Sequence, residues 1–415
     1  MHLFKTTSLI ALFCVAALSS TLFSQAPAPA GVTVYEGARL IVGDGSAAIE
    51  NSAFVVDGGR FTQVGRAGQV QVPAGAARVS LAGKTVMPAI VDAHTHMPVM
   101  QPALADSLRR KAYYGVGAVL SMGQDTTDVT YQVRAQPIPG AALLRTAGRG
   151  ITMPEPGRSE APFWVTTTAE ARKAVQENAA KKVDVIKIWV DDRNGMYKKL
   201  TPELYAAVID EAHRNQLRVA AHIFTLEDGK GLLKAGLDVF AHGVRDRDID
   251  EEFVTMIRQR PMTVLIPNLP DRGVATDLSW LSGSMPADEL KKLQAGATDR
   301  PEAQKTFGIQ ARNLAQLNAA GVRIALGTDG NVPYAHHIEM EDMVAAGMTP
   351  AQVIVSATRN AADFLRITDA GTVAVKKSAD FIVLDANPLE DIKNTRRINA
   401  VYLRGAAVDR SNPAR

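Results

Sequence analysis

Short apolar runs alternate with amphipathic helical stretches through the middle of the chain, from about residue 85 to about residue 365. This repeated order predicts strand–helix units, which build either a closed parallel barrel or a doubly wound open sheet. The apolar runs end near His96, Met122, Ala147, Val190, Ile223, Val244, Pro267 and Asp329. About eight such units favour a (β/α)8 barrel of the TIM type. No glycine-rich nucleotide fingerprint follows the first run, which disfavours the open sheet.

The two ends of the chain consist of short alternating segments separated by glycines. Thr33–Tyr35 and Phe54–Asp57 precede the middle region, and Asp380–Leu384 and Ala400–Leu403 follow it. Such segments predict small antiparallel strands. We therefore expect an α/β fold in which both chain ends build one small β-sandwich beside the barrel. The predicted parts are sandwich residues 27–86, barrel residues 87–367 and sandwich residues 368–415.

The first 26 residues have the pattern of a signal peptide. Leu9–Leu18 is an apolar run of ten residues, which is too short to cross about 30 Å of hydrocarbon but suits a signal core. Cys14, the only cysteine, lies inside this run, so the mature chain would contain no thiol. We expect an exported, periplasmic protein with no membrane attachment after cleavage. An uncleaved N-terminal anchor is the alternative.

Charge and composition exclude several classes of protein. The chain has 46 Lys and Arg against 43 Asp and Glu, and the basic residues form no stripe that would bind nucleic acid. A hydrophobic fraction of 46% with 21% charged residues excludes both a disordered chain and a polytopic membrane protein.

Histidines and an aspartate stand where the predicted barrel strands end. His94 and His96 close the first strand, and their spacing of two places both on one side of it. His222, His242 and Asp329 close the fifth, sixth and eighth strands. Since the carboxyl ends of parallel barrel strands meet at one rim, these side chains should converge. Imidazoles with a carboxylate are ligands for a divalent transition metal, zinc first among them.

Lys187 lies in a strand, Val185–Trp189, that is otherwise wholly apolar. An unpaired ammonium in such a strand would cost several kcal/mol. The lysine must therefore lose its proton, pair with an acid, or be carboxylated by carbon dioxide. Carboxylation would remove the charge and supply an anionic group able to bridge two metal ions.

Together these residues resemble the amidohydrolase superfamily, in particular its imidazolonepropionase-related, prolidase-like branch of binuclear metal hydrolases. The resemblance rests on Val91–His96, Ile186–Ile188, Ala221–His222, Ala241–Gly243 and Gly327–Asp329. Glu339–Asn360 and Lys377–Leu384 are also similar, so the likeness spans nearly the whole mature chain. The segment Trp189–Gly195 departs from the turn of dipeptidase relatives, and dipeptide specificity is not carried over.

The resemblance implies two divalent metal ions, zinc being expected, and a ligand for each. His94, His96 and Asp329 would hold one ion, His222 and His242 the other, and Lys187, as N6-carboxylysine, would bridge them. A hydroxide between the ions would then attack the substrate, with Asp329 as general base and acid. The resemblance also implies a homo-oligomer.

The expected substrate is a small molecule with an amide bond, either peptide-like or an N-acyl amino acid. That makes the chain an amidohydrolase of carboxypeptidase or dipeptidase type. Candidate substrate contacts on the mouth loops are Arg158, Trp164, Arg193, Tyr197, His336 and His337. A lactone, a cyclic amide or a phosphotriester is an alternative substrate, because the same hydroxide would serve. A periplasmic metal-binding protein without turnover is the non-enzymatic alternative.

Overall fold

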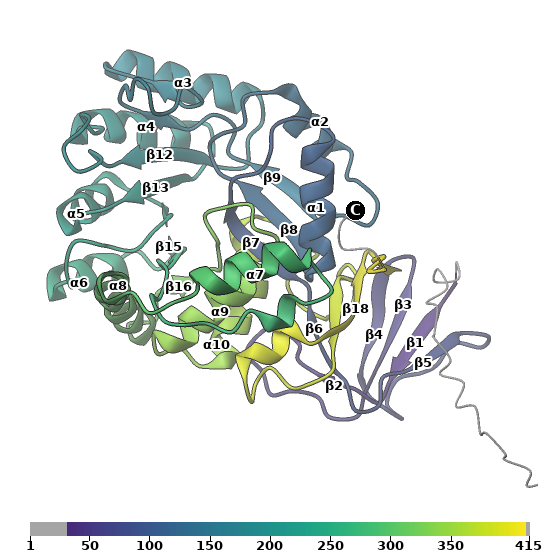
Figure 1. Cartoon of the computed structure of the whole chain (residues 1–415). Coiled ribbons are helices and arrows are strands. Elements are labelled where there is room, and N and C mark those ends of the chain that lie inside the picture. Colours follow the sequence, from purple (N-terminus) through teal and green to yellow (C-terminus); the bar gives the residue numbers. More distant parts are fainter. Residues whose placement is uncertain (1–30, 412–415) are drawn as a thin grey trace, which may run out of the picture.

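Figure 1 shows the computed structural model of the chain, which describes residues 31–411. A barrel with helices around its outside lies beside a β-sandwich, in which purple N-terminal strands and yellow C-terminal strands are neighbours. The predicted signal peptide, with Cys14, lies outside the described residues. Among the helices of residues 31–411, none combines the length and the apolar character needed to span a membrane.

Parallel strands form the barrel wall, as the sequence predicts. They are β7 (Ile90–Thr95), β8 (Val116–Ser121), β9 (Leu143–Thr146) continued by β10 (Ile151–Thr152), β12 (Ile186–Val190), β13 (Val219–Ile223), β14 (Val239–Phe240), β15 (Val264–Leu265) and β16 (Arg323–Ile324). β9 pairs with β8 and β10 pairs with β12, so these two segments are successive parts of the third strand. The short strand β11 (Phe163–Trp164) pairs with the outer part of β10.

Backbone hydrogen bonds close the barrel between its first and last strands. Ala93 N–H donates to Leu326 O at 2.9 Å, and Asp329 N–H donates to His94 O at 2.8 Å. β16 itself ends at Ile324, but these bonds carry its pairing with β7 on to Asp329. The eighth strand therefore delivers Asp329 directly beside His94.

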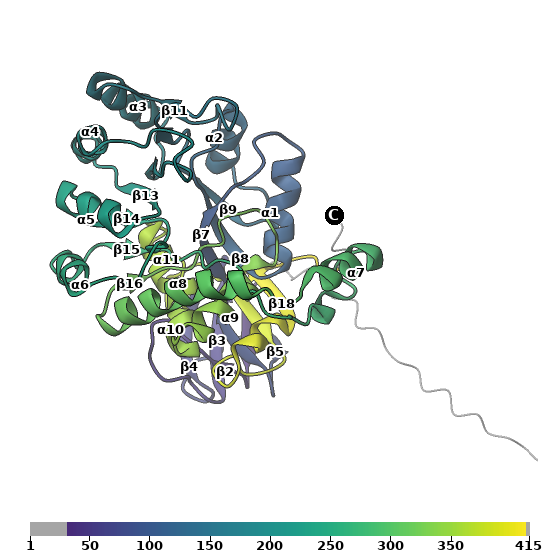
Figure 2. The ribbon, with the colours of Figure 1, turned by 60° about the vertical axis from the view of Figure 1, so that its left-hand side comes forward.

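The helices follow the strands, and most of them cover the outside of the barrel (Figures 1 and 2), whereas the helix of residues 287–296, which buries no residue, projects from it in Figure 2. They are α1 (Ala103–Tyr113), α2 (Asp128–Ala135), α3 (Thr168–Ala180), α4 (Pro202–Arg214), α5 (Leu226–Ala235), α6 (Glu251–Arg258), α7 (Ala287–Gly296), α8 (Pro301–Ala319), α9 (Ala335–Ala345), α10 (Pro350–Val355) and α11 (Ala361–Phe364). Their starts follow from local sequence. The Thr201 hydroxyl accepts from Leu204 N–H with Pro202 in the first turn, and Thr167 with Glu170 forms a capping box.

The β-sandwich consists of a four-stranded and a five-stranded sheet. The first has the order β4 (Arg60–Arg66), β3 (Ser52–Asp57), β1 (Thr33–Glu36), β5 (Ala77–Ser80). The second has the order β19 (Ala406–Ala407), β18 (Ile398–Leu403), β17 (Phe381–Leu384), β6 (Thr85–Pro88), β2 (Arg39–Leu40). The second sheet joins strands from both chain ends, which confirms the predicted fold class.

The five-stranded sheet is apolar on both of its faces. Phe381 and Val383 pack in the core of the sandwich, with Phe54 and other aromatic residues of the opposite sheet. Ile382 and Leu384, which alternate with them, belong to the main core that the barrel and its helices share. The sandwich is therefore joined to the barrel through a continuous apolar contact.

Candidate metal centre

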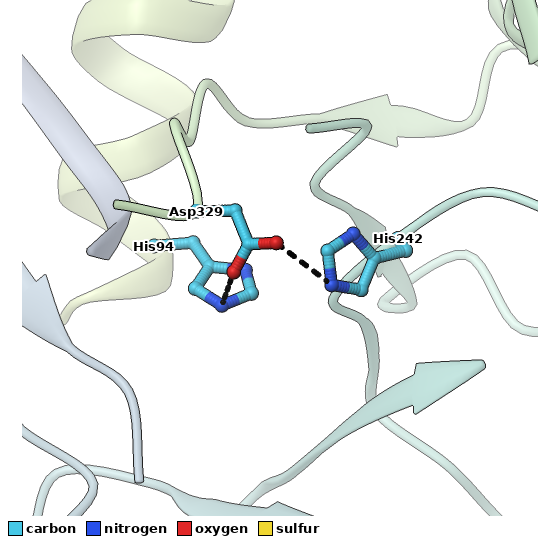
Figure 3. A group of neighbouring side chains, drawn as sticks. All are labelled: His94, His242 and Asp329. Atoms are coloured by element: carbon cyan, nitrogen blue, oxygen red, sulfur yellow. Dashed lines mark ion pairs between the residues drawn. The ribbon is translucent and has the colours of Figure 1, made fainter. Parts of the chain in front are cut away.

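His94, His242 and Asp329 meet at the carboxyl-terminal rim of the barrel (Figure 3). His94 Nε2 lies 3.2 Å from Asp329 Oδ1, and His242 Nε2 lies 3.5 Å from Asp329 Oδ2. The potential ligand atoms of the three residues all lie within 4.8 Å of one another. His96 joins them, because its Nε2 is 3.1 Å from Asp329 Oδ1.

The inward positions of the barrel strands explain how the cluster forms. In β12 and β13 the side chains alternate, so Val185 and Lys187, and likewise Ala220 and His222, occupy positions of one face. Val185 and Ala220 belong to the apolar cluster that fills the barrel, and the two polar residues follow them towards the rim. The pairing of β7 shifts register between Asp92 and Thr95, close to His94.

The imidazoles of the cluster are held neutral. Burial lowers the pKa of His94 and that of His222 to about 3, and burial also depresses the pKa of His242. The Nε2 atom of His242 is shielded from solvent and has no hydrogen-bond partner among the described residues. A neutral imidazole with an unused buried nitrogen fits a metal ligand, since a metal ion would satisfy the nitrogen lone pair.

Asp329 is the carboxylate on which the histidines converge. Burial would raise its pKa, but the electrostatic interaction with His94 and the hydrogen bonds from His94 and His96 outweigh burial and keep the pKa below its ordinary value. Its backbone has a φ of 52°, in the left-handed region that residues with a Cβ seldom adopt. Such a conformation at a polar site marks a functional constraint.

Lys187 is completely buried beside His94. Its Nζ lies 3.5 Å from His94 Nε2 and 3.4 Å from Met122 Sδ, and no carboxylate pairs with it within residues 31–411. Burial lowers the pKa of Lys187 to about 7, so a neutral amine is accessible near neutral pH. A neutral amine is the form that reacts with carbon dioxide.

His222 lies next to His242 and contacts two charged groups. The two ring centroids are 4.5 Å apart. His222 Nε2 lies 2.9 Å from Asp191 Oδ2 and 3.2 Å from Arg193 Nη1. The structure thus brings all six predicted metal-site residues into one neighbourhood: His94, His96, Lys187, His222, His242 and Asp329.

Two groups of supporting contacts were not predicted from the sequence, those of Asn268 and those of Asp92. Asn268 Nδ2 lies 2.6 Å from His94 Nδ1 and 2.7 Å from Ala241 O, so Asn268 fixes the ring from behind. Lys111 and Asp92 form a completely buried ion pair of 2.8 Å. Asp92 also accepts from the Thr328 hydroxyl at 2.8 Å and thereby holds the backbone next to Asp329. The sequence signal that could have revealed these contacts was Asp92 itself, an aspartate between apolar residues in the first strand.

Three of the predicted substrate contacts gather around residues 155–156. Arg193 Nε lies 3.1 Å from Glu155 Oε1, and Arg158 binds the other oxygen of the same carboxylate. The Tyr197 hydroxyl donates to Pro156 O at 3.2 Å. Trp164 lies in β11, and its indole Nε1 is buried without a hydrogen-bond partner among the described residues. These positions agree with a mouth loop, while a role in substrate binding stays a prediction.

His336 and His337 lie inside the protein and not on a surface where they would contact substrate. Both lie in α9 with 0% and 1% of their surface exposed. His336 Nε2 lies 2.9 Å from Tyr114 O, and His337 Nδ1 lies 3.1 Å from the Thr395 hydroxyl. The helix turns both rings into the protein interior, so their burial argues for packing and not for contact with substrate.

A cavity of about 520 Å³ opens beside the cluster. It lies between the residues after β15, helices α7 and α9, and Thr328, the neighbour of Asp329. Its lining includes apolar Leu269, Leu293 and Ile338 together with the ionisable residues Arg272 and Glu339. This volume and mixed lining suit a small organic molecule.

Comparison with known proteins agrees with the geometry. The model of the amidohydrolase family matches residues 85–408. An ochratoxinase from Aspergillus niger is 27% identical over 293 residues, which cover 63% of this chain and 57% of that protein. The match thus spans little more than half the length of this relative. An imidazolonepropionase from Deinococcus radiodurans is 26% identical, over 86% of this chain and 92% of its own.

Among solved structures, a Bifidobacterium longum protein assigned as a prolidase is 28% identical to this chain. The two superpose with a TM-score of 0.77, over 93% of this chain and 96% of the other. The relatives agree with the imidazolonepropionase-related, prolidase-like resemblance inferred from the sequence.

Proposed function

We propose that this chain, which belongs to the amidohydrolase family, hydrolyses an amide-type bond with divalent metal ions and with Asp329 as the proton-transfer group. The proposed substrate is a peptide-like amide or an N-acyl amino acid. The observation that carries the proposal is the convergence of neutral imidazoles on one carboxylate at the barrel rim.

Different residues of the chain would hold each of the two ions. His94, His96 and Asp329 would hold one zinc ion, and His222 with His242 would hold a second. Lys187, as carboxylysine, would lie between the two ions. The unpartnered Nε2 of His242 and the absence of an acidic partner for Lys187 among the described residues support this assignment. Bound divalent ions would acidify water and polarise the substrate carbonyl.

Asp329 is placed to move a proton between water and the leaving group. Its two carboxylate oxygens face different histidines, Oδ1 towards His94 and His96 and Oδ2 towards His242. A carboxylate held at this point can accept the proton of the attacking water and deliver it to the departing nitrogen. Neither a serine nor a cysteine nucleophile is required for this route.

The proposal is tested by measuring metal content and hydrolysis on the same samples. Elemental analysis should find zinc, and a panel of N-acyl amino acids and dipeptides should contain hydrolysed members. Chelation should abolish that hydrolysis, and readdition of zinc should restore it. Hydrolysis that survives complete metal removal would contradict the proposal. Cleavage of lactones or phosphotriesters, without cleavage of any amide, would contradict the proposed substrate class.

A further inference from the structure

We propose that Arg245 and Arg193 form a carboxylate-binding subsite beside His222, and that this subsite selects amides bearing a free carboxylate next to the scissile bond. This inference rests on the proposed function and adds the feature of the substrate that the chain recognises. It follows from unused guanidinium donors and from the distribution of charge at the rim.

Arg245 is fixed in place but has no partner for its side chain. It lies three residues after His242, and its backbone N–H donates to Phe224 O at 2.9 Å. This bond ties the segment after β14 to the segment after β13. The Nε atom of Arg245 is shielded from solvent without a hydrogen-bond partner. Within residues 31–411 its guanidinium makes no ion pair and no side-chain hydrogen bond.

Arg110 in α1 and Arg260 after α6 share this lack of a partner, but only Arg245 follows a predicted metal ligand so closely. Arg218 and Arg272, which also have a buried, unsatisfied Nε, differ from Arg245 because they have partners. Arg218 donates another guanidinium nitrogen to Phe364 O and stacks on the Phe364 ring. Arg272 lies 2.9 Å from a carboxylate oxygen of Asp342. A partly buried guanidinium without any such contact is costly, and a bound anion would offset the cost.

The acids near Arg245 are already engaged by other groups. Asp191 Oδ2 lies 2.7 Å from Arg193 Nη1 and 2.9 Å from His222 Nε2. Asp329 is occupied by the histidines. Burial lowers the pKa of Arg245, and the charges of Asp329 and Asp191 oppose that effect, so both acids act on Arg245. Neither acid forms an ion pair or a hydrogen bond with its guanidinium among the described residues.

Arg193 supplies the second half of the subsite. Its Nε and Nη1 atoms bind Glu155 and Asp191, at 3.1 and 2.7 Å. These bonds leave Nη2, which is buried without a hydrogen-bond partner in the described part of the chain. Arg193 Nη1 lies 3.2 Å from His222 Nε2, and the Arg245 backbone is bonded to Phe224, two residues after His222, so both arginines flank the end of β13. Each arginine offers at least one unused N–H, and a carboxylate has two oxygens to receive them.

Such a subsite would orient the substrate. Two donors on one carboxylate fix both its position and its plane, since guanidinium N–H groups are directional. With the carboxylate held beside His222, the adjoining amide would lie over the cluster that contains Asp329. Carboxylate recognition would then act mainly on substrate binding, and proton transfer would depend on Asp329.

The test compares substrate pairs that differ only in the carboxylate. An N-acyl amino acid and its carboxamide analogue are assayed with the wild-type protein, Arg245→Gln and Arg245→Lys. Arg247→Gln is the matched control, because Arg247 lies in the same segment, is exposed, and pairs with Asp246. For Arg245→Gln, kcat/KM of the acid should fall about 30-fold or more, chiefly through KM. The kcat/KM of Arg245→Gln for the carboxamide should stay within about threefold of the wild-type value.

Further outcomes separate the subsite from the chemistry. Arg245→Lys should keep part of the preference for the acid, since it retains the charge without the planar fork. Arg247→Gln should behave as wild type, and the zinc content should be equal in all variants. Equal losses on acid and carboxamide in Arg245→Gln would overturn the subsite and leave the proposed function standing.

Binding without turnover is measured by calorimetry with a non-hydrolysable N-alkyl amino acid. The wild-type protein should bind it, and Arg245→Gln should bind it at least about 10-fold more weakly. Equal binding by both proteins would overturn the subsite. If no amide is hydrolysed by the wild-type protein, the proposed function fails, while calorimetry still decides whether the carboxylate binds.

Discussion

Asp329 combines an unusual backbone conformation with contacts to three histidines. Its left-handed φ is stabilised by the bond from its N–H to His94 O and by the Asp92 contact to Thr328. A side chain placed at such a cost is expected to act in the reaction and not only in folding.

Asp329→Asn should therefore keep the fold but lose turnover. An amide cannot accept the proton of the attacking water, so kcat should fall about 100-fold or more. Circular dichroism should be unchanged, and metal content should be measured on the same sample to separate proton transfer from ligand loss. Wild-type turnover in a folded variant would remove Asp329 from this role.

Asp342, in the wall of the cavity, should make stability depend on pH. Burial raises its pKa to about 7 against the effect of Arg272, so the folded state holds this proton more tightly than the unfolded state. Its contribution to stability is therefore full below about pH 4 and is lost as pH rises to about 7. Urea unfolding of Asp342→Asn and wild type at pH 5 and pH 8 should show the variant gaining relative to wild type at the higher pH.

The same comparison with Asp288→Asn, at an exposed position, controls for the loss of one charge. A stability difference between Asp342→Asn and wild type that is equal at both pH values would show that burial does not perturb this carboxyl.

Individual ligands could be predicted from the sequence because their positions follow from strand ends, which periodicity reveals. The partners of those ligands could not, because they depend on which loops meet in space. Asn268 and Arg245 lie in segments with no periodicity, and only the folded rim brings them to His94 and His222. The prediction that His336 and His337 contact substrate relied on their closeness to the eighth strand in sequence, which does not determine which way a helix faces.

At the scale of elements, glycines allow neighbouring strands to approach at the rim. A Cβ on Gly327 would lie 2.4 Å from Ile266 Cγ2 and 2.7 Å from both His94 Cβ and Asn268 Oδ1. Gly243 is also adjacent to a predicted ligand, His242, but a Cβ there would meet nothing within 4 Å. The two positions form a matched pair for testing the role of strand spacing.

Gly327→Ala should destabilise the protein by about 1–3 kcal/mol, because its added methyl group overpacks the contact between strands. It should also weaken zinc binding, since the displaced neighbours are His94 and the residue that holds it. Gly243→Ala should change stability by less than about 0.5 kcal/mol. Urea unfolding and zinc titration measure both effects, and equal behaviour of the two variants would refute the spacing argument.

Strand order was predictable, and β7, β8, β9, β12 and β13 end within one residue of the predicted positions. The later strands end earlier than predicted, with β14 ending at Phe240 and β16 at Ile324. β14, β15 and β16 are each only two residues long, although the apolar runs that contain them are longer. Near the rim the backbone leaves regular pairing in order to present His242, Asn268 and Asp329. The apolar pattern predicts burial, and burial continues to the rim. The pattern does not predict where regular backbone hydrogen bonding between the strands ends.

At the scale of the whole molecule, the five-stranded sheet couples the sandwich to the barrel. Val383→Ala removes two buried methyl groups from the sandwich side of β17 and should cost about 2 kcal/mol. Because the opposite side of the same sheet packs on the barrel, activity and the circular dichroism signal should be lost together. Both should have the same urea midpoint, which should be lower than that of the wild-type protein. Val375→Ala, at a position 50% exposed, is the control. Activity that persists to the wild-type midpoint would show that the two parts unfold separately.

The pairing of β6 with β17 also constrains the order of events on the ribosome. Thr85–Pro88 is synthesised well before the strand it needs, Phe381–Leu384, because the whole barrel lies between them in the sequence. Contacts so distant in sequence slow folding, because a long loop must close before they form. A nascent chain would therefore have to hold β6 without its neighbour β17 until all of the barrel has been synthesised.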